Sequence, residues 1–386
     1  MRIALFCHSI LSDWNHGNAH FLRGVVRELL ERGHRVTVHE PSGGWSVSNL
    51  LADEGPQAVD EVRRSFPWLA PERYELPDLL RGGLEELVDG TDLVLVHEWT
   101  APELVSALGR LRQRGGDFLL LFHDTHHRSV SDPEAMEALD LSGYDGVLAF
   151  GEVVRMRYLE RGWAPRAWTW HEAADTRLFR PSPHPTERDG EVVWIGNWGD
   201  EERTAELTEF LLEPIRRLGV RGTVHGVRYP PEARAAVQRA GGRFAGRVPN
   251  HRVPEVLARH LVTVHVPRRP YIGILPGVPT IRPFEAMACG IPLVSSPWQD
   301  VEGLFRRGVD HLVAEDGRAM EGHLRDLIHD PELRRDLARE GLRTVQERHT
   351  CAHRVDELLA IVAELGADPR PAVGPASAAN AREATA

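Results

Sequence analysis

The sequence contains no lysine, so all 46 basic residues other than histidine are arginine. Mechanisms that need an ε-amine are therefore excluded, among them a P-loop, a lysine Schiff base and pyridoxal-phosphate chemistry. Cysteine is scarce as well, with three residues far apart in the chain: Cys7, Cys289 and Cys351. An odd number of cysteines without metal-ligand spacing predicts neither a disulfide framework nor a zinc site, and it fits a reducing compartment.

Long hydrophobic runs are also missing. No stretch of about 18 or more apolar residues occurs, and residues 1–7 form a short β-like run rather than a charged region before a long apolar one. We therefore expect a cytoplasmic protein without a signal peptide or a membrane span. Arginine clusters at 110–114 and 155–161 leave contact with an anionic membrane or an acidic acceptor open, although helix-end charge compensation is the preferred interpretation.

The net charge of −11 argues against a nucleic-acid partner, because phosphate contacts need a basic stripe. A small phosphorylated ligand needs only a local basic pocket. With 386 residues, 42% of them hydrophobic and 27% charged, the chain has the composition of a globular protein with material for two cores.

Short apolar runs alternate with helical patterns along the chain. Residues 3–7 and 36–40 are β-prone, and apolar residues at helical spacing between them complete a βαβ unit. A second series of such units follows the proline-rich segment 181–185. The pattern predicts an α/β protein with two doubly wound, Rossmann-like parallel sheets facing a cleft. The expected boundaries are 1–172 for the N-terminal domain, 173–185 for a linker or crossover, 186–365 for the C-terminal domain and 366–386 for a disordered tail.

The segment 280–294, TIRPFEAMACGIPLV, gives the strongest local signal. It predicts a loop, a helix opened by Pro283, a glycine stop and a buried strand. Free amides at that helix start, at Thr280 and Ile281, together with Arg282, offer a diphosphate site, and Glu285 one turn later can accept hydrogen bonds from ribose hydroxyls. The alternative is purely structural, with Pro283 as a first-turn residue and Glu285 favouring the helix dipole.

This segment resembles the C-terminal domain of GT-B glycosyltransferases, whose donor-site helix commonly reads E-A-M-A-C-G before a proline and a β-run. Residues 174–181 are similar to the interdomain crossover of these enzymes. Residues 244–248 are similar to their F-x-G-x-V stretch, and the resemblance implies that backbone groups near Arg247 and Val248 meet the nucleobase.

More narrowly, residues 194–199 with Arg203, and residues 349–354, resemble the CgeB-like branch of the retaining family 4 enzymes. The resemblance implies that the glycine turn at Gly196 and Asn197 approaches the donor phosphates and that Arg203 takes the part a lysine often has there. A solvated charge at a helix start is the alternative for Arg203. Gly277 is an expected donor-side position in this resemblance, but it stands where retaining enzymes usually carry the first of two glutamates, so the contact to the transferred sugar is left open.

The loop after the first strand, residues 12–18, is not a GxGxxG loop, which weakens any dinucleotide-oxidoreductase interpretation. Gly17 can bring backbone close to donor phosphate, while Asp13, His16 and Asn18 can hold acceptor hydroxyls. An ordinary polar βα loop with Asn18 near a helix cap is an equal alternative.

The run FHDTHH at 122–127 closes another apolar strand. Similar enzymes often carry His-Asp at this strand end with the histidine near the transferred sugar, so His123 is the expected catalytic residue of the N-terminal half and Asp124 an acceptor contact. A metal cluster of Asp124, His126 and His127 is a minor alternative, because arginines and a helix dipole can neutralise a leaving diphosphate without a metal.

Together these observations predict a nucleotide-sugar-dependent hexosyltransferase that acts on a hydroxyl of a small-molecule, glycan or lipid acceptor. The expected catalytic residues are His123, Arg203 and Arg282. We expect a UDP-sugar rather than a GDP-sugar donor, no cofactor, no required metal and retention of configuration; for inversion, His123, Asp124 or Asp13 would be candidate bases. A GT-B sugar-nucleotide epimerase and a non-catalytic nucleotide-sugar-binding protein are the alternatives.

Overall fold

A computed structural model of the chain describes residues 1–183, 187–199 and 201–371. Parts of the predicted linker 173–185 and of the predicted tail 366–386 therefore lie outside the described residues. Among the residues that are described, no helix has both the length and the apolar character that crossing a bilayer requires.

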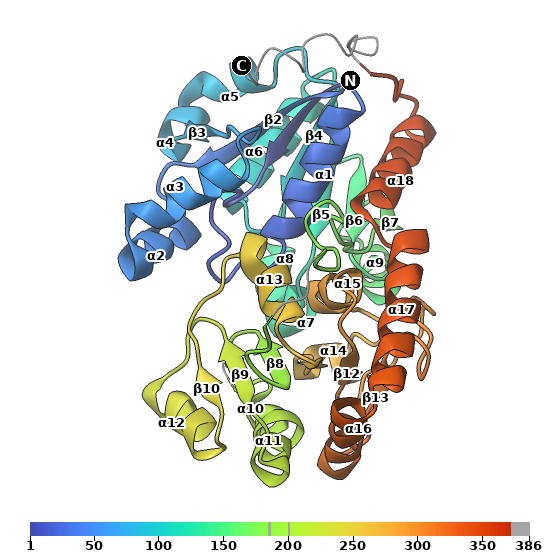
Figure 1. Ribbon diagram of the computed structural model, residues 1–386. Coiled ribbons are helices and arrows are strands. Elements are labelled where there is room, and N and C mark those ends of the chain that lie inside the picture. Colours follow the sequence, from blue (N-terminus) through green and yellow to red (C-terminus); the bar gives the residue numbers. More distant parts are fainter. Residues whose placement is uncertain (184–186, 200, 372–386) are drawn as a thin grey trace.

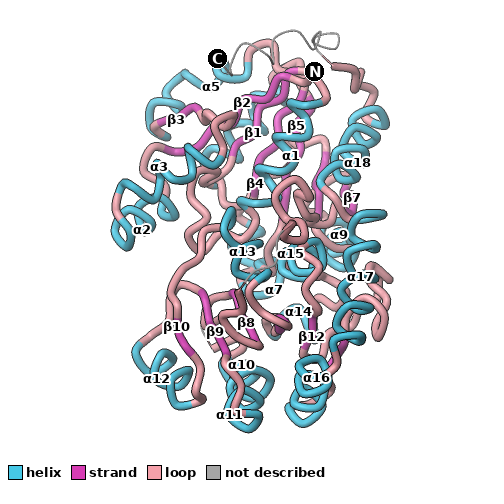
Figure 2. Tube along the Cα trace, in the orientation of Figure 1, coloured by secondary structure: helices cyan, strands magenta, loops and turns pink. Residues whose placement is uncertain are grey.

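Two groups of parallel strands form the framework, and Figure 2 shows them in magenta as two separate sheets. The first sheet contains β1 (Arg2–Phe6), β2 (Arg35–Pro41), β3 (Glu72–Tyr74), β4 (Leu93–His97), β5 (Leu119–Asp124), β6 (Gly146–Ala149) and β7 (Ala167–Thr169). The second contains β8 (Val192–Ile195), β9 (Gly222–His225), β10 (Arg243–Phe244), β11 (Val262–His265), β12 (Leu293–Ser295) and β13 (Leu312–Val313).

The strand order is β3-β2-β1-β4-β5-β6-β7 in the first sheet and β10-β9-β8-β11-β12-β13 in the second. Every pair within them is parallel. The order reverses beside β1 and beside β8, and such reversals open a crevice at the carboxyl ends of the strands, where ligands bind. The predicted fold class, two doubly wound parallel sheets, is confirmed.

Helices cover the sheets (Figure 1). Those of the first half are α1 (Ala19–Glu31), α2 (Trp45–Glu54), α3 (Pro56–Ser65), α4 (Leu76–Asp78), α5 (Leu84–Val88), α6 (Pro102–Gln113), α7 (Arg128–Ser131), α8 (Pro133–Glu137) and α9 (Glu152–Glu160). Those of the second half are α10 (Thr204–Leu207), α11 (Glu213–Leu218), α12 (Pro231–Arg239), α13 (Val253–Ala258), α14 (Arg269–Gly273), α15 (Ile281–Ala288), α16 (Gly317–His329), α17 (Pro331–Arg348) and α18 (Cys351–Glu364). Because helices shield both faces, a central strand such as β4 is buried along its whole length and reads as a continuous apolar run.

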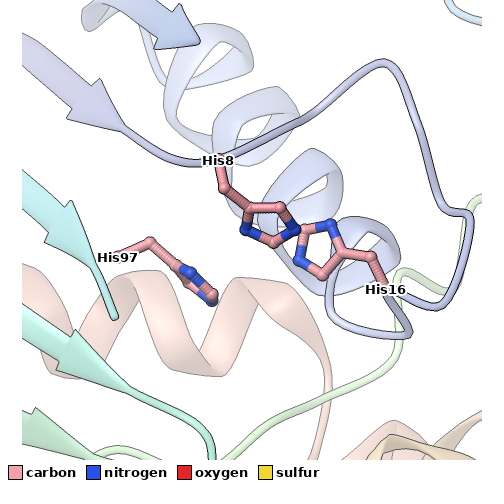
Figure 3. Close-up of side chains that lie close together, drawn as sticks. All are labelled: His8, His16 and His97. Atoms are coloured by element: carbon pink, nitrogen blue, oxygen red, sulfur yellow. The ribbon is translucent and has the colours of Figure 1, made fainter. Parts of the chain in front are cut away.

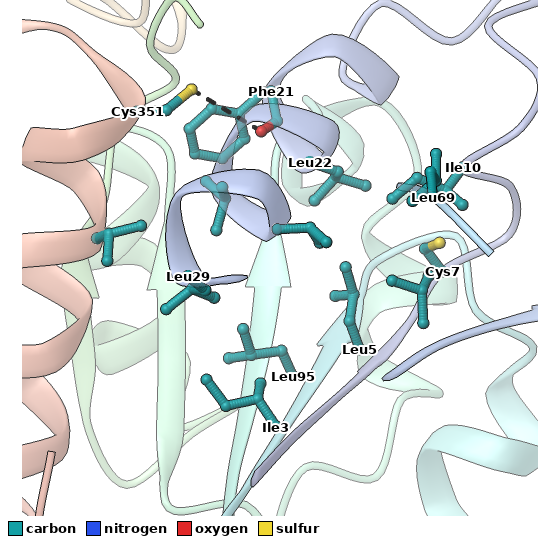
Figure 4. Packing of buried hydrophobic residues seen from close by; sticks show 14 of the residues in the cluster. Ile3, Leu5, Cys7, Ile10, Phe21, Leu22, Leu29, Leu69, Leu95 and Cys351 are labelled. Atoms are coloured by element: carbon teal, nitrogen blue, oxygen red, sulfur yellow. Dashed lines mark hydrogen bonds between the residues drawn. The ribbon is translucent and has the colours of Figure 1, made fainter. Parts of the chain in front are cut away.

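The last helix, α18, returns to the first sheet and packs against α1 (Figure 1). The sulfur of Cys351, at the start of α18, lies 4.0 Å from the carbonyl oxygen of Phe21 (Figure 4). The indole N–H of Trp170 donates to the carbonyl of Arg354 at 2.8 Å. A Cβ on Gly24 would lie 2.5 Å from the Cys351 sulfur, so a glycine is needed for this close approach. The predicted C-terminal domain runs to residue 365 and so includes α18. In the structure, however, α18 packs into the hydrophobic core of the first sheet.

Candidate active site

A cavity of about 820 Å³ lies between the two halves, where the loops after the strands of both sheets meet. Its lining includes thirteen residues that are discussed below: His8, Asp13, His16, Gly17, Asn18, Glu172, Gly196, Asn197, Arg203, Arg268, Thr280, Ile281 and Arg282. Arg247 and Val248, expected near the nucleobase, line it too. The cavity therefore brings together most of the residues predicted from both halves of the sequence.

The start of α15 faces this cavity. The helix begins at Ile281, two residues before the predicted Pro283, and its N-cap Thr280 makes no capping bond with its side chain. The Thr280 hydroxyl lies instead 3.4 Å from Nε2 of His265 on β11. The first amides of the helix are thus left for another acceptor, and an uncapped helix start favours an anion.

Arg203 approaches the same place from the loop after β8. Its guanidinium donates to the carbonyl of Val266 at 3.1 Å and to the side chain of Asn197 at 2.6 Å, and it lies over the ring of Trp194 at 5.0 Å. A Cβ on Gly196 would come within 3.4 Å of this guanidinium, and one on Gly199, which has a φ of 96°, would lie 2.4 Å from the Arg203 side chain. The glycines of this turn therefore make room for Arg203, a role that the sequence did not indicate.

Of the arginines that line the cavity, three lie near one another, so that the charges of Arg268 and Arg282 act on Arg203. Arg268 pairs with Glu202 and Arg282 with Glu285, but among the described residues no carboxylate forms an ion pair with Arg203. Burial, with the charges of Arg268 and Arg282, lowers the pKa of Arg203 to about 10. A buried cation beside two others is a place where an anion binds favourably.

Glu285 lies beneath the cavity and not in its lining. It is 1% exposed, and one carboxylate oxygen lies 2.9 Å from Nδ1 of His20 while the other pairs with Arg282. Nε2 of His20 accepts from the backbone N–H of Asp175 at 2.9 Å, so a neutral His20 carries its proton on Nδ1 and donates to Glu285. The predicted ribose contact of Glu285 stays a prediction; the described contact positions Arg282.

Gly277 has a φ of 89° and lies against Val301 and Glu302, outside the cavity lining. A side chain there would meet Val301 at 2.5 Å, and its backbone is in the region that favours glycine. The conformation of the chain explains this glycine, and its expected donor contact is untested.

The loop between β1 and α1 joins the two halves. Asp13, buried, receives hydrogen bonds from Arg23 at 3.4 Å, from Arg247 and from the backbone N–H of Asn250 at 3.0 Å. Asn197 of the second half donates to Asn15 at 2.8 Å. Although Asp13 lines the cavity, its carboxylate is occupied by two arginines, which leaves little of it for an acceptor hydroxyl.

Gly17 and Asn18 complete this loop. A Cβ on Gly17 would lie 3.2 Å from the Ile281 side chain, so the loop backbone sits directly against the start of α15. Asn18 donates to the hydroxyl of Thr125, which in turn donates to Glu98 at 2.6 Å. Asn18 is also the N-cap residue of α1, but its side chain makes no capping hydrogen bond. Helix capping by the side chain therefore does not explain an asparagine at this position.

His123 and Asp124 are not among the residues that line the cavity, and their predicted roles stay predictions. His123 packs between Phe21 and Trp170, with ring centroids 5.8 and 4.7 Å away, and burial lowers its pKa to about 3. Asp124 accepts from the Tyr158 hydroxyl at 2.8 Å, and burial raises its pKa. Both side chains belong to a strand that is buried along its whole length.

Three other histidines gather at this end of the first sheet: His8, His16 and His97 (Figure 3). His8 and His16 line the cavity, with ring centroids 4.0 Å apart. Burial lowers the pKa of all three, that of His8 to about 3, so each imidazole is neutral at neutral pH. Among the described residues this trio has the spacing of metal ligands, whereas the minor alternative of Asp124, His126 and His127 does not.

Glu172 was not singled out from the sequence. It is 2% exposed, lines the cavity, and has one carboxyl oxygen without a partner among the described residues. Burial and the charge of Glu285 raise its pKa well above the usual range. A signal was present, because Glu172 lies three residues after the end of β7, in the region where the strand-end rule places ligand contacts. The same rule applies to His8, two residues after β1.

Comparison with known proteins agrees with this geometry. Residues 203–360 match the family model of glycosyl transferase-like proteins. The chain is 26% identical over 299 residues to the O-antigen biosynthesis protein RfbC of Myxococcus xanthus, a match that covers 73% of this chain and 22% of that protein. The chain thus matches about a fifth of that curated relative's length.

Solved structures share the architecture. Sucrose-phosphate synthase from Thermosynechococcus elongatus superimposes with a TM-score of 0.65 at 16% identity, covering 95% of this chain and 100% of the other. Anabaena HepE, crystallised with UDP and glucose, superimposes with a TM-score of 0.65 at 14% identity, covering 94% and 99%. At such identities these likenesses establish the fold, and the predicted GT-B architecture is confirmed.

Proposed function

We propose that this chain, a GT-B protein that resembles glycosyltransferases over its whole fold and carries a glycosyl transferase-like segment at 203–360, transfers a sugar from a nucleotide-diphosphate sugar to an acceptor hydroxyl. The observation that carries the proposal is the convergence of Arg203, Arg268 and Arg282 with the uncapped start of α15 on one side of the cavity.

The diphosphate lies between these groups. Amide N–H groups of the first turn of α15 and the guanidinium forks of Arg203 and Arg282 bind its oxygens. As the bond from sugar to phosphate breaks, negative charge grows on the departing oxygen, and groups already held in place stabilise that charge without reorganisation. Arg203 is held by Val266 and Asn197, and Arg282 is held by Glu285 until the diphosphate competes for it.

A uridine diphosphate sugar, with a hexose as the transferred group, is the donor we favour. Anabaena HepE, with the same fold, was crystallised with UDP and glucose, which supports uridine for this chain. Val248 and the backbone at Arg247 line the cavity on the side where the resemblance places the base. Because three arginines and a helix start supply positive charge, no metal is needed to hold the diphosphate.

We infer retention of the anomeric configuration. An inverting enzyme needs a base beside the acceptor hydroxyl, and the three candidates named from the sequence are poorly placed for it: His123 and Asp124 lie outside the cavity lining, and Asp13 is paired with Arg23 and Arg247. Glu172, with its raised pKa, is suited to donate a hydrogen bond to a sugar hydroxyl. An oxygen of the donor phosphate then accepts the proton of the acceptor.

The acceptor is a glycan, lipid or small molecule that enters from the side of His16 and Asn18. The Myxococcus relative is an O-antigen biosynthesis protein, which supports a glycan or its lipid-linked precursor. Incubation of the chain with UDP-glucose, with and without candidate acceptors, tests the proposal by release of UDP. Release of UDP together with sugar transfer or donor hydrolysis supports the proposal. Tight binding of the UDP-sugar without any turnover would support the non-catalytic alternative. A changed configuration of the sugar in the free donor would support the epimerase alternative.

A further inference from the structure

We propose that His8, His16 and His97 form a binding site for one divalent transition-metal ion, Zn²⁺ in the first place. One nitrogen from each ring lies within 4.8 Å of the others (Figure 3). Around a tetrahedral zinc ion with Zn–N bonds of about 2.0–2.1 Å the nitrogens are about 3.3–3.4 Å apart. Small rotations of the side chains therefore bring the three rings to a common ion.

The three rings are buried and short of hydrogen-bond partners. His8, His16 and His97 are 3%, 5% and 0% exposed. Both nitrogens of His8, both of His16 and Nδ1 of His97 have no hydrogen-bond partner among the described residues. Leaving buried polar atoms unpaired costs free energy, so a cluster of this kind implies a ligand. A metal ion binds neutral imidazole through its lone pair and satisfies one nitrogen of each ring.

Neighbouring groups contact two of the three rings, and at His97 the contact is of the kind that orients metal-binding histidines. Nε2 of His97 lies 3.4 Å from the hydroxyl of Thr125, and that hydroxyl donates to buried Glu98 at 2.6 Å. The indole of Trp45 stacks on His8 with centroids 5.1 Å apart and planes 4° from parallel. The strand-end rule points to His8 alone, and the trio as a set was not predictable because His8 and His16 lie in the loop after β1 while His97 is the last residue of β4.

The set of ligands indicates the kind of site. Three histidines leave one tetrahedral position for water or a hydroxyl oxygen, the arrangement of catalytic rather than structural zinc. His8 and His16 line the cavity, so that position faces it. The trio lies on the first-sheet side, opposite the three arginines; it is therefore separate from the diphosphate contacts, and the proposal does not depend on sugar transfer.

Tag-free protein, stripped with a chelator, is titrated with Zn²⁺ by calorimetry and with Co²⁺ by visible spectroscopy. We expect one ion per chain and a Co²⁺ absorption typical of four-coordination. His16→Gln and His97→Gln should each lower the affinity by at least about tenfold, and the triple variant with His8→Gln should abolish binding. The matched control is His260→Gln, since His260 is 2% exposed with an unpartnered Nε2 but lies in the second half.

Melting curves without metal establish that each variant is folded, and added Zn²⁺ should raise the melting temperature of the wild type and the control alone. Three outcomes would overturn the proposal: no stoichiometric ion in the wild type, binding that survives in the folded triple variant, or equal loss of binding in His260→Gln. In the first case the trio would be a neutral hydrogen-bonding surface for a hydroxyl-rich acceptor.

Discussion

The two sides of the cavity differ in their charge. The second-sheet side presents Arg203, Arg268, Arg282 and a helix start, and Arg203 forms no ion pair with a carboxylate among the described residues. The first-sheet side presents imidazoles that burial keeps neutral, and an acidic residue, Glu172, whose pKa is raised. The first arrangement suits a diphosphate; the second suits hydroxyl groups. Under the proposed function, this difference would direct the diphosphate of the donor to one side and the hydroxyl groups of the acceptor to the other.

Removal of the arginines on the second-sheet side should have the largest effect on activity. Arg203→Ala and Arg282→Ala should each lower kcat by about two to three orders of magnitude, because their contacts strengthen as the diphosphate departs. Arg→Lys at either position should recover part of the activity, since lysine keeps the charge but not the planar fork. Arg217→Ala, an exposed arginine on α11, is the control. Wild-type steady-state kinetics in Arg282→Ala would remove that residue from the site.

Glu285→Ala should weaken binding of the nucleotide by about 1–3 kcal/mol, because it removes a charged hydrogen-bonding group and the anchor of Arg282. Calorimetry with UDP on the folded variant measures this. Glu285→Gln keeps the shape of the side chain and separates the loss of charge from the loss of packing. Unchanged affinity in both variants would leave Glu285 a purely structural partner of His20.

Lowering the pH should reduce the free energy of unfolding, because several histidines on the first-sheet side are buried. Burial lowers the pKa of His8 and of His123 to about 3, below the ordinary value of 6.5. The stability that these neutral, buried histidines contribute is complete above pH 6.5 and is lost as the pH falls towards 3, because the unfolded chain then takes up protons that the folded chain does not. The free energy of unfolding falls by up to about 1.4 kcal/mol per pH unit for each histidine. Urea unfolding at pH 7.5, 6.5 and 5.5 should show this slope, and His123→Gln should reduce it. A stability independent of pH over this range would contradict the burial of these rings.

The smallest effect should come from the contact that joins the two sides. Asn15→Gly removes the acceptor of the Asn197 side chain and should lower the free energy of unfolding by about 0.5–1.5 kcal/mol. Glycine is the substitution to use because Asn15 has a φ of 48°, where alanine would add strain. Donor affinity should stay near that of the wild type. A loss of affinity as large as that of Arg282→Ala would mean that the contact itself orders the donor site.

The residues predicted on the second-sheet side mostly line the cavity, whereas His123 and Asp124 of the first-sheet side do not. Thr280, Ile281, Arg282 and Arg203 were found because an uncapped helix start and a strand-end loop are local features, readable from neighbouring residues. On the first-sheet side the sequence pointed to His123 and not to His97, although the two are paired in register on β5 and β4. Neither of these two strand-end histidines lines the cavity, and His123 packs between Phe21 and Trp170, which both lie far away in the sequence.

The most direct test of the central claim is a calorimetric titration of the wild-type chain with UDP in the presence of a chelator. The arrangement of Arg203, Arg268, Arg282 and the start of α15 predicts saturable binding of one nucleotide per chain without any metal, stronger than the binding of NAD under the same conditions. Binding of UDP that appears only after a divalent cation is added, or that is no stronger than the binding of NAD, would contradict the assignment of this side of the cavity to the donor diphosphate.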